Sequence, residues 1–129
     1  MTSDVITGDW LDRARARVNA DPKFRKRGSI DTTMGLKVGG DAFLVSFAAF
    51  GCTEVRTQAS DLRDADFVIE MSADQWQRYL AARRAGTGRT LAELDTTDGI
   101  VKAQSPRKKL DFLRYHTSLQ AFFDAGTVA

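Results

Sequence analysis

The sequence predicts an α+β fold: a five-stranded, mostly antiparallel sheet with helices packed on one face. Three observations support it. Apolar residues recur every three or four positions near both ends of the chain, as in amphipathic helices. Alternating segments in the middle fit half-buried strands, and glycine-containing turns separate the first of them. The 129 residues suffice for one domain, 1–129, with its own core.

The first helix is expected over about residues 7–19. Thr7 is a suitable N-cap, and Asp9 places a negative charge in the first turn. The apolar face consists of Trp10, Leu11, Ala14 and Val18. We expect this face to pack on the core, and docking on a partner stays open as the alternative. The basic run 23–27 that follows is interpreted as a solvated loop. The alternative is a contact with an acidic ligand headgroup or an anionic membrane surface.

Three strands in a meander come next. The first starts near residue 29, and its buried side is expected to hold Ile30, Thr32, Met34, Leu36 and Val38. A hairpin at residues 39–41 leads to a second strand, 42–50, which is apolar on both faces. Such a strand lies in the middle of a sheet, with its second face covered by protein, a ligand or a subunit partner. A turn at 51–53 and a strand at 54–59 complete the meander.

The middle of the chain predicts a strand followed by a helix. Phe67–Met71 alternates as a strand, and Ser72 with Gln75 forms a capping-box pattern at the start of the helix. Trp76 and Tyr79 share the inward face of that helix.

A second short helix and a fifth strand follow. Thr90 and Glu93 again fit a capping box. Asp98 and Gly99 are typical of a hairpin turn, after which residues 100–104 are expected to form the strand.

The last helix, expected over residues 107–125, is rich in aromatic residues, and Gly126 is a suitable stop. Its apolar stripe is wider than packing on a small sheet needs, so we expect it to line a cavity. The stripe consists of Phe112, Tyr115, Leu119, Phe122 and Phe123, with Leu110 and Leu113 beside it.

Composition argues against several classes of function. A net charge of +2 is too small to indicate a nucleic-acid-binding protein. The single cysteine, Cys52, cannot form an internal disulfide, and the first residues do not resemble a secretory signal, so a cytoplasmic protein is expected. No ligand spacing predicts a metal site, and no motif predicts a cofactor or a catalytic residue. The single histidine, His116, lies beside the aromatic stripe, where it can hydrogen-bond a ligand oxygen.

Three segments resemble the sterol carrier protein 2 family of small lipid-binding domains. ADFVIEMSADQWQRYL at 65–80 is similar to the strand, serine cap and aromatic helix of that family. FLVSFAAFG at 43–51 resembles its central strand, and DGIVKAQ at 98–104 its last strand before the closing helix. The resemblance spans about residues 24–124. Unlike the family pattern, the segment between the middle helix and the last strand is lengthened here by AARRAGTGRT.

The resemblance implies that a sterol, fatty acyl chain or acyl-CoA binds in a tunnel between sheet and helices. The ligand-binding residues that we predict, with His116 added for its position, are Phe43, Val45, Phe47, Trp76, Tyr79, Phe112, Leu113, His116, Phe122 and Phe123.

The leading hypothesis is therefore non-catalytic binding or transfer of a hydrophobic small molecule or acyl lipid. Two alternatives stay open. One is a small lyase, isomerase or hydrolase acting on an apolar substrate, with Glu70, Asp66 or His116 as general base. The other is an accessory subunit of a larger enzyme. Transient contact with a membrane surface and a homodimer stay open as well.

Overall fold

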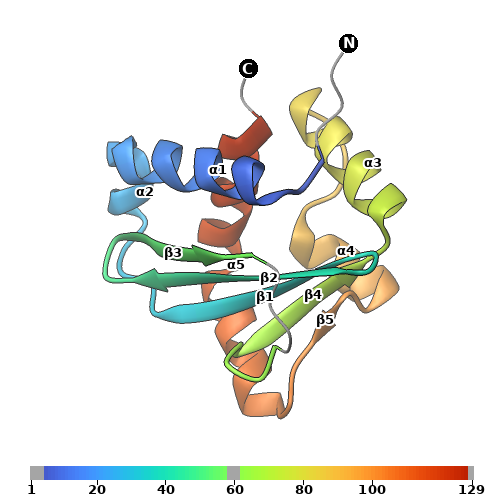
Figure 1. The fold of residues 1–129 in the computed structure, drawn as a ribbon. Helices are drawn as coiled ribbons and strands as arrows, with labels where there is room; N and C mark the ends of the chain where they lie inside the picture. Colours follow the sequence, from blue (N-terminus) through green and yellow to red (C-terminus); the bar gives the residue numbers. More distant parts are fainter. Residues whose placement is uncertain (1–4, 58–61, 128–129) are drawn as a thin grey trace.

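The computed structural model describes residues 5–57 and 62–127. Its helices and strands are shown in Figure 1. The helices are α1 (Gly8–Ala20), α2 (Pro22–Lys26), α3 (Ala73–Arg84), α4 (Leu91–Asp98) and α5 (Pro106–Thr127). The strands are β1 (Thr32–Val38), β2 (Asp41–Ala48), β3 (Gly51–Arg56), β4 (Phe67–Met71) and β5 (Val101–Lys102).

The strands form one sheet in the order β3-β2-β1-β4-β5. Neighbouring strands are antiparallel except β1 and β4, which are parallel, with Leu36 opposite Ile69. The predicted α+β class and the mostly antiparallel sheet are therefore confirmed, and β1, β2 and β3 form the predicted meander.

One face of the sheet and all five helices share one apolar core. Strand residues alternate between the two faces, so every second residue of β1, β2 and β4 points into this core. The large buried strand residues are Met34, Leu36, Val38, Phe43, Val45, Phe47, Phe67, Ile69 and Met71. The helices add Trp10 and Leu11 from α1, Phe24 from α2, Trp76 and Leu80 from α3, Leu91 from α4 and Phe112, Leu119, Phe122 and Phe123 from α5.

The other face of the sheet is partly covered by the chain itself. Leu44 of β2 is buried although it points away from the core. Its neighbour across the β1–β2 pair is Gly35, and a Cβ added there would lie 3.1 Å from the Cβ of Ala65 and 3.5 Å from Cδ1 of Leu62. The segment that leads into β4 thus packs directly on the second face of the central strands. At Leu44, the second face of the doubly apolar strand is therefore covered by the protein itself.

Three predicted helix starts are confirmed by side-chain caps. Thr7 accepts a hydrogen bond from the backbone N–H of Trp10 at the start of α1. Ser72 and Thr90 form complete capping boxes at the starts of α3 and α4. Each cap satisfies backbone donors that a first helical turn leaves without partners.

Residues 23–26 of the basic segment lie in helix α2, with Arg27 as its C-cap, so the prediction of a loop is wrong. Asp21 caps α2 by accepting from the backbone N–H of Lys23 at 2.9 Å, and Pro22 occupies the first helical position. Phe24 is buried in the core. An acidic cap followed by proline is a helix-start signal, and burial of Phe24 stabilises a helix too short to persist alone.

The turn between β2 and β3 lies at Ala49 and Phe50, two residues earlier than predicted, and Phe50 is exposed at its tip. Ala49 adopts a φ of 54°, a left-handed conformation unusual for a residue other than glycine. Gly51 lies in β3, where an added Cβ would approach Oδ1 of Asn19 to 2.6 Å. The Asn19 side chain bonds both backbone polar groups of Cys52, at 2.8 and 2.9 Å. This contact with α1 sets where the strand begins.

Gly99 is the C-cap of α4 and does not form the predicted hairpin turn. Its φ is 62°, and its backbone N–H donates to the carbonyl of Asp95. The Asp95 carboxylate then accepts from the backbone N–H of Val101 at 2.9 Å, which places β5 beside β4. The left-handed backbone at this glycine closes a helix.

The final helix is longer than predicted and includes Gly126. A Cβ at this glycine would lie 2.4 Å from two ring atoms of Trp10, so the glycine allows α1 and α5 to approach each other. At 22 residues α5 exceeds the other described helices in length. No helix in the described part of the chain combines the length and apolarity needed to cross a membrane.

Candidate site for an apolar ligand

A layer of aromatic rings lies in the core, and Phe123 of α5 is at its centre. The ring of Phe123 lies 5.5 Å from Trp76, 5.5 Å from Phe122, 6.0 Å from Trp10 and 6.1 Å from Tyr79, between ring centroids. These spacings are typical of favourable aromatic pairs. Rings from α1, α3 and α5 therefore meet at one point.

Eight of the ten predicted ligand-binding residues are brought together in the core. They come from β2, α3 and α5, and are Phe43, Val45, Phe47, Trp76, Tyr79, Phe112, Phe122 and Phe123. Two lie apart from the layer. His116 is half-buried beside Phe112, and Leu113 is 51% exposed on the outer side of α5.

The position of Trp76 is set by a hydrogen bond as well as by packing. Its indole N–H donates to the carbonyl of Lys37 in β1 at 2.8 Å. Because a buried indole N–H without an acceptor is costly, this bond fixes the ring against the sheet. The capping box at Ser72 begins the helix one turn earlier. Local sequence and one long-range bond together place Trp76 in the layer.

Polar groups adjoin the aromatic layer at Tyr79. The side-chain amide of Gln120 donates to the Tyr79 hydroxyl at 2.7 Å. The amide oxygen of Gln120 accepts from the backbone N–H of Leu91 at 2.8 Å. Burial raises the pKa of the Tyr79 hydroxyl, which the hydrogen bond from Gln120 partly opposes. The hydroxyl therefore stays protonated at neutral pH.

An ion pair anchors this polar group at the surface. Arg83 of α3 binds Asp124 of α5 through two contacts, Nε to Oδ1 at 2.9 Å and Nη2 to Oδ2 at 2.8 Å. The Gln120 amide also donates to Asp124 at 3.0 Å. The hydrogen bond from Arg83 to Asp124 raises the pKa of the guanidinium. Helices α3, α4 and α5 are thus joined by one connected set of polar contacts.

An open surface hollow of about 500 Å³ lies between the start of α1 and the ends of β2 and β3. Its lining includes Ile6 and Phe43, both of which belong to the core. Asp9, Asp12 and Asp41 stand around it. The hollow therefore borders the apolar core.

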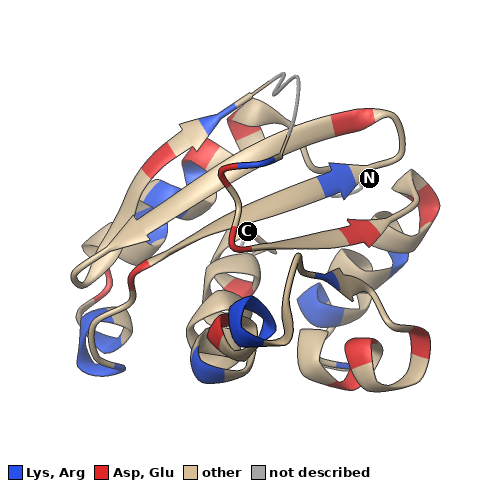
Figure 2. Ribbon diagram, turned by 90° about the horizontal axis from the view of Figure 1, so that it is seen from below, with Lys and Arg blue, Asp and Glu red and all other residues tan. Residues whose placement is uncertain are grey.

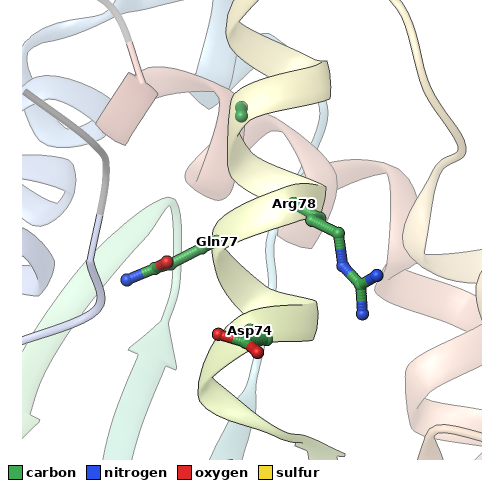
Figure 3. A pocket seen from close by; sticks show the side chains of 4 residues that line it. Asp74, Gln77 and Arg78 are labelled. Atoms are coloured by element: carbon green, nitrogen blue, oxygen red, sulfur yellow. The ribbon is translucent and has the colours of Figure 1, made fainter. Parts of the chain in front are cut away.

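A second hollow, of about 310 Å³, lies on the outer face of α3. Its lining residues include Asp74, Gln77 and Arg78. Figure 3 shows Gln77 and Arg78 pointing in opposite directions from the helix, so their polar groups do not converge on a common ligand atom. The arrangement fits a solvated helix face.

The proposed general bases do not form a catalytic group. Glu70 is exposed on β4, on the face opposite the core. Asp66 accepts from the hydroxyl of Thr32 at 2.7 Å and lies 4.0 Å from Nζ of Lys108. Asp66 and Glu70 are four residues apart, about 13 Å along an extended chain. His116 lies on α5 against Phe112. No two of these groups are placed as a paired acid and base.

Cys52 is buried in β3, and desolvation raises the pKa of its thiol from 9.0 to about 12, although nearby Arg15 acts in the opposite direction. A thiol with this pKa is not a nucleophile at neutral pH. Among residues 5–57 and 62–127 no group of three or more His, Cys, Asp or Glu side chains is arranged to hold a metal ion.

The raised pKa of Cys52 predicts a pH-dependent stability. In the unfolded chain the thiol ionises near pH 9.0, whereas the folded protein keeps the proton until about pH 12. Above pH 9.0 the unfolded state therefore binds fewer protons, and the free energy of unfolding falls as pH rises, by up to ~1.4 kcal/mol per pH unit from this group. Denaturant unfolding just below and one unit above pH 9.0 measures the fall. We expect a smaller fall in Cys52→Ala, and an equal one would contradict the assignment.

Sequence reasoning expected Trp10 to pack on the core but did not identify its contact with Phe123. Its helical spacing indicated burial, but spacing does not say which partner a buried ring meets. Gln120 was not singled out, because a glutamine in an aromatic helix is equally compatible with solvent. The helical register, which sets Gln120 one turn from Asp124, was the available signal.

Two comparisons with known proteins found nothing: no family model and no curated protein matches the sequence. Among solved structures, sterol carrier protein 2 superposes with a TM-score of 0.71 and 20% sequence identity, over 95% of this chain and 98% of that chain. A UbiJ-SCP2 ubiquinone synthesis protein matches with a TM-score of 0.51 and 17% identity, over 90% of this chain and 91% of that one. The chain therefore has the fold of sterol carrier protein 2, the family that its sequence resembles.

Proposed function

We propose that this protein binds or transfers a hydrophobic small molecule or acyl lipid, held between the sheet and the helices without covalent chemistry. The observation that carries the proposal is the aromatic layer around Phe123, formed by rings from three separate helices. Apolar surface of this kind binds ligands by removing their apolar area from water, at roughly 25 cal/mol per Å² before ordering costs.

A ligand would take the place of contacts that core side chains now make with one another. Met34 and Met71 line the same core, and flexible thioether side chains repack at low cost. The hollow beside Ile6 and Phe43 is the route we propose for entry, because both side chains line it and belong to the same apolar core as the aromatic layer.

The polar end of the layer would orient the ligand. The Tyr79 hydroxyl accepts from Gln120 and keeps its own proton, which it can donate to a hydroxyl, carbonyl or carboxylate oxygen of the ligand. This arrangement suits a molecule with one polar end and a long apolar body, such as a fatty acid.

Tryptophan quenching by a brominated fatty acid tests the proposal. The chain has two tryptophans, Trp10 and Trp76, and both contact Phe123. In Trp10→Phe the remaining fluorescent reporter is Trp76, and in Trp76→Phe it is Trp10. A brominated fatty acid bound in the layer should quench both reporters strongly, because bromine quenches only at contact, while the unbrominated acid should not.

The control is a fluorescent fatty acid that reports binding independently of tryptophan. Binding of this probe without quenching of either reporter would place the ligand elsewhere and reject the proposed site. Failure of fatty acid, acyl-CoA and sterol alike to bind, together with no lipid in native mass spectra of the purified protein, would reject the function.

The enzymatic alternative has no comparable support, because Glu70, Asp66 and His116 do not form a paired acid and base. Accessory-subunit and homodimer roles stay predictions. Light scattering of the isolated chain tests both, since an interface-dependent subunit would not be a clean monomer.

A further inference from the structure

Two leucines of α5 are exposed on its outer side. Leu110 is 56% and Leu113 51% exposed, the largest exposed fractions among the large apolar side chains of the described residues. They lie three positions apart, so they share one face of the helix. Their neighbour Phe112 points the other way and is fully buried against Phe67. The first turns of α5 are thus apolar on two opposite faces, and only one of them is used in folding.

Positive charges flank the two leucines. Arg107 and Arg114 are exposed and lie on one side of the two leucines, three and four positions from Leu110. On the other side is Lys109, four positions from Leu113, with its Nζ 3.0 Å from Asp95. The acidic residue of these turns, Asp111, is half-buried and lies four positions after Arg107 and three before Arg114, on the same side of the helix as both arginines. Figure 2 shows this basic region on α5 apart from the basic residues of α2.

The charge pattern discriminates between partners. A second copy of the chain packed on the same two leucines would bring Arg107 and Arg114 close to the same arginines of the other copy, and like charges repel. Two leucines also fall far short of the roughly 800 Å² per partner of a stable protein interface. A bilayer with anionic headgroups suits both features, because basic side chains meet the headgroups while leucines enter the boundary of the acyl chains.

We propose that this α5 face, formed by Arg107, Leu110, Leu113 and Arg114, docks the protein on an anionic lipid bilayer. The inference does not rest on the ligand site, because the face lies outside the core. Docking here would bring the protein to the surface of an anionic membrane.

Co-sedimentation with vesicles tests the docking face. The probes are phosphatidylcholine vesicles with and without phosphatidylglycerol, and no lipid ligand is added. The wild-type chain should bind the anionic vesicles, and less so as salt is raised. Leu110→Ser/Leu113→Ser and Arg107→Gln/Arg114→Gln should each lower the partition coefficient about tenfold or more. All four side chains are exposed, so the variants should keep the wild-type unfolding midpoint.

The matched control is Arg25→Gln/Arg27→Gln, which removes the same charge from α2 and should leave binding within about twofold of wild type. Three outcomes overturn the proposal: absence of wild-type binding, unchanged binding of the leucine variant, or loss of binding in the α2 control but not in the α5 variants. A wild-type dimer that becomes monomeric in the leucine variant would assign the face to self-association instead and overturn it too. No lipid ligand is added in this assay. A negative result would therefore reject the docking face without bearing on ligand binding in the core.

Discussion

Replacing Phe123 by alanine is expected to lower the free energy of unfolding by ~3–5 kcal/mol. The side chain is fully buried and contacts rings from α1, α3 and α5. Truncation removes its apolar area and leaves a cavity that three helices and the sheet cannot easily close. Equilibrium unfolding in urea, with fluorescence of Trp10 and Trp76 as the signal, measures the loss.

The matched control is Phe50→Ala, the same change at an exposed turn. Phe50 is 44% exposed and has Arg25 5.8 Å above its ring. Its loss should cost about 0.5 kcal/mol, the scale of surface substitutions. If the two variants were equally stable, Phe123 would not be the centre of the packed layer.

Replacing Gly126 by alanine is expected to destabilise the protein by ~1–3 kcal/mol through overpacking. The direction is informative, because alanine in place of glycine within a helix ordinarily stabilises by up to ~1 kcal/mol. Here the added Cβ would lie 2.4 Å from the Trp10 ring, so α1 and α5 must separate. A shift of the thermal unfolding midpoint to lower temperature is the expected observation.

A control and a rescue accompany this variant. Gly40→Ala adds the same methyl group in open space and should be close to neutral. In a Trp10→Leu background the collision is removed, so Gly126→Ala should become neutral or stabilising, and the double-mutant cycle should show clear coupling. Additive effects of the two substitutions would contradict the proposed contact.

Much of the local structure was predictable because its causes are local. The caps at Ser72 and Thr90 work through bonds within four residues, so their patterns identify helix starts directly. Strand alternation in Phe67–Met71 likewise needs no partner to be recognised. The sheet class followed from these elements and their order.

The errors arose where distant contacts choose between local alternatives. Gly51, Gly99 and Gly126 were all read as turn or stop signals, yet only Gly99 uses a left-handed backbone, and it ends a helix. Gly51 and Gly126 are glycines because Asn19 and Trp10 approach them closely. The absence of a side chain serves packing there, and a sequence does not distinguish that use from chain reversal.

For the candidate site, the sequence by itself determined which residues are apolar and which face of each helix they occupy. That was enough to select eight of the residues that meet in the core. Only the tertiary structure decided that Phe123 is their centre, that Gln120 joins Tyr79 to Asp124, and that Leu113 turns outward beside Leu110. Helical periodicity gives each residue an angle around its own axis, but α5 is apolar on two sides, and only the position of the sheet determines which side is buried.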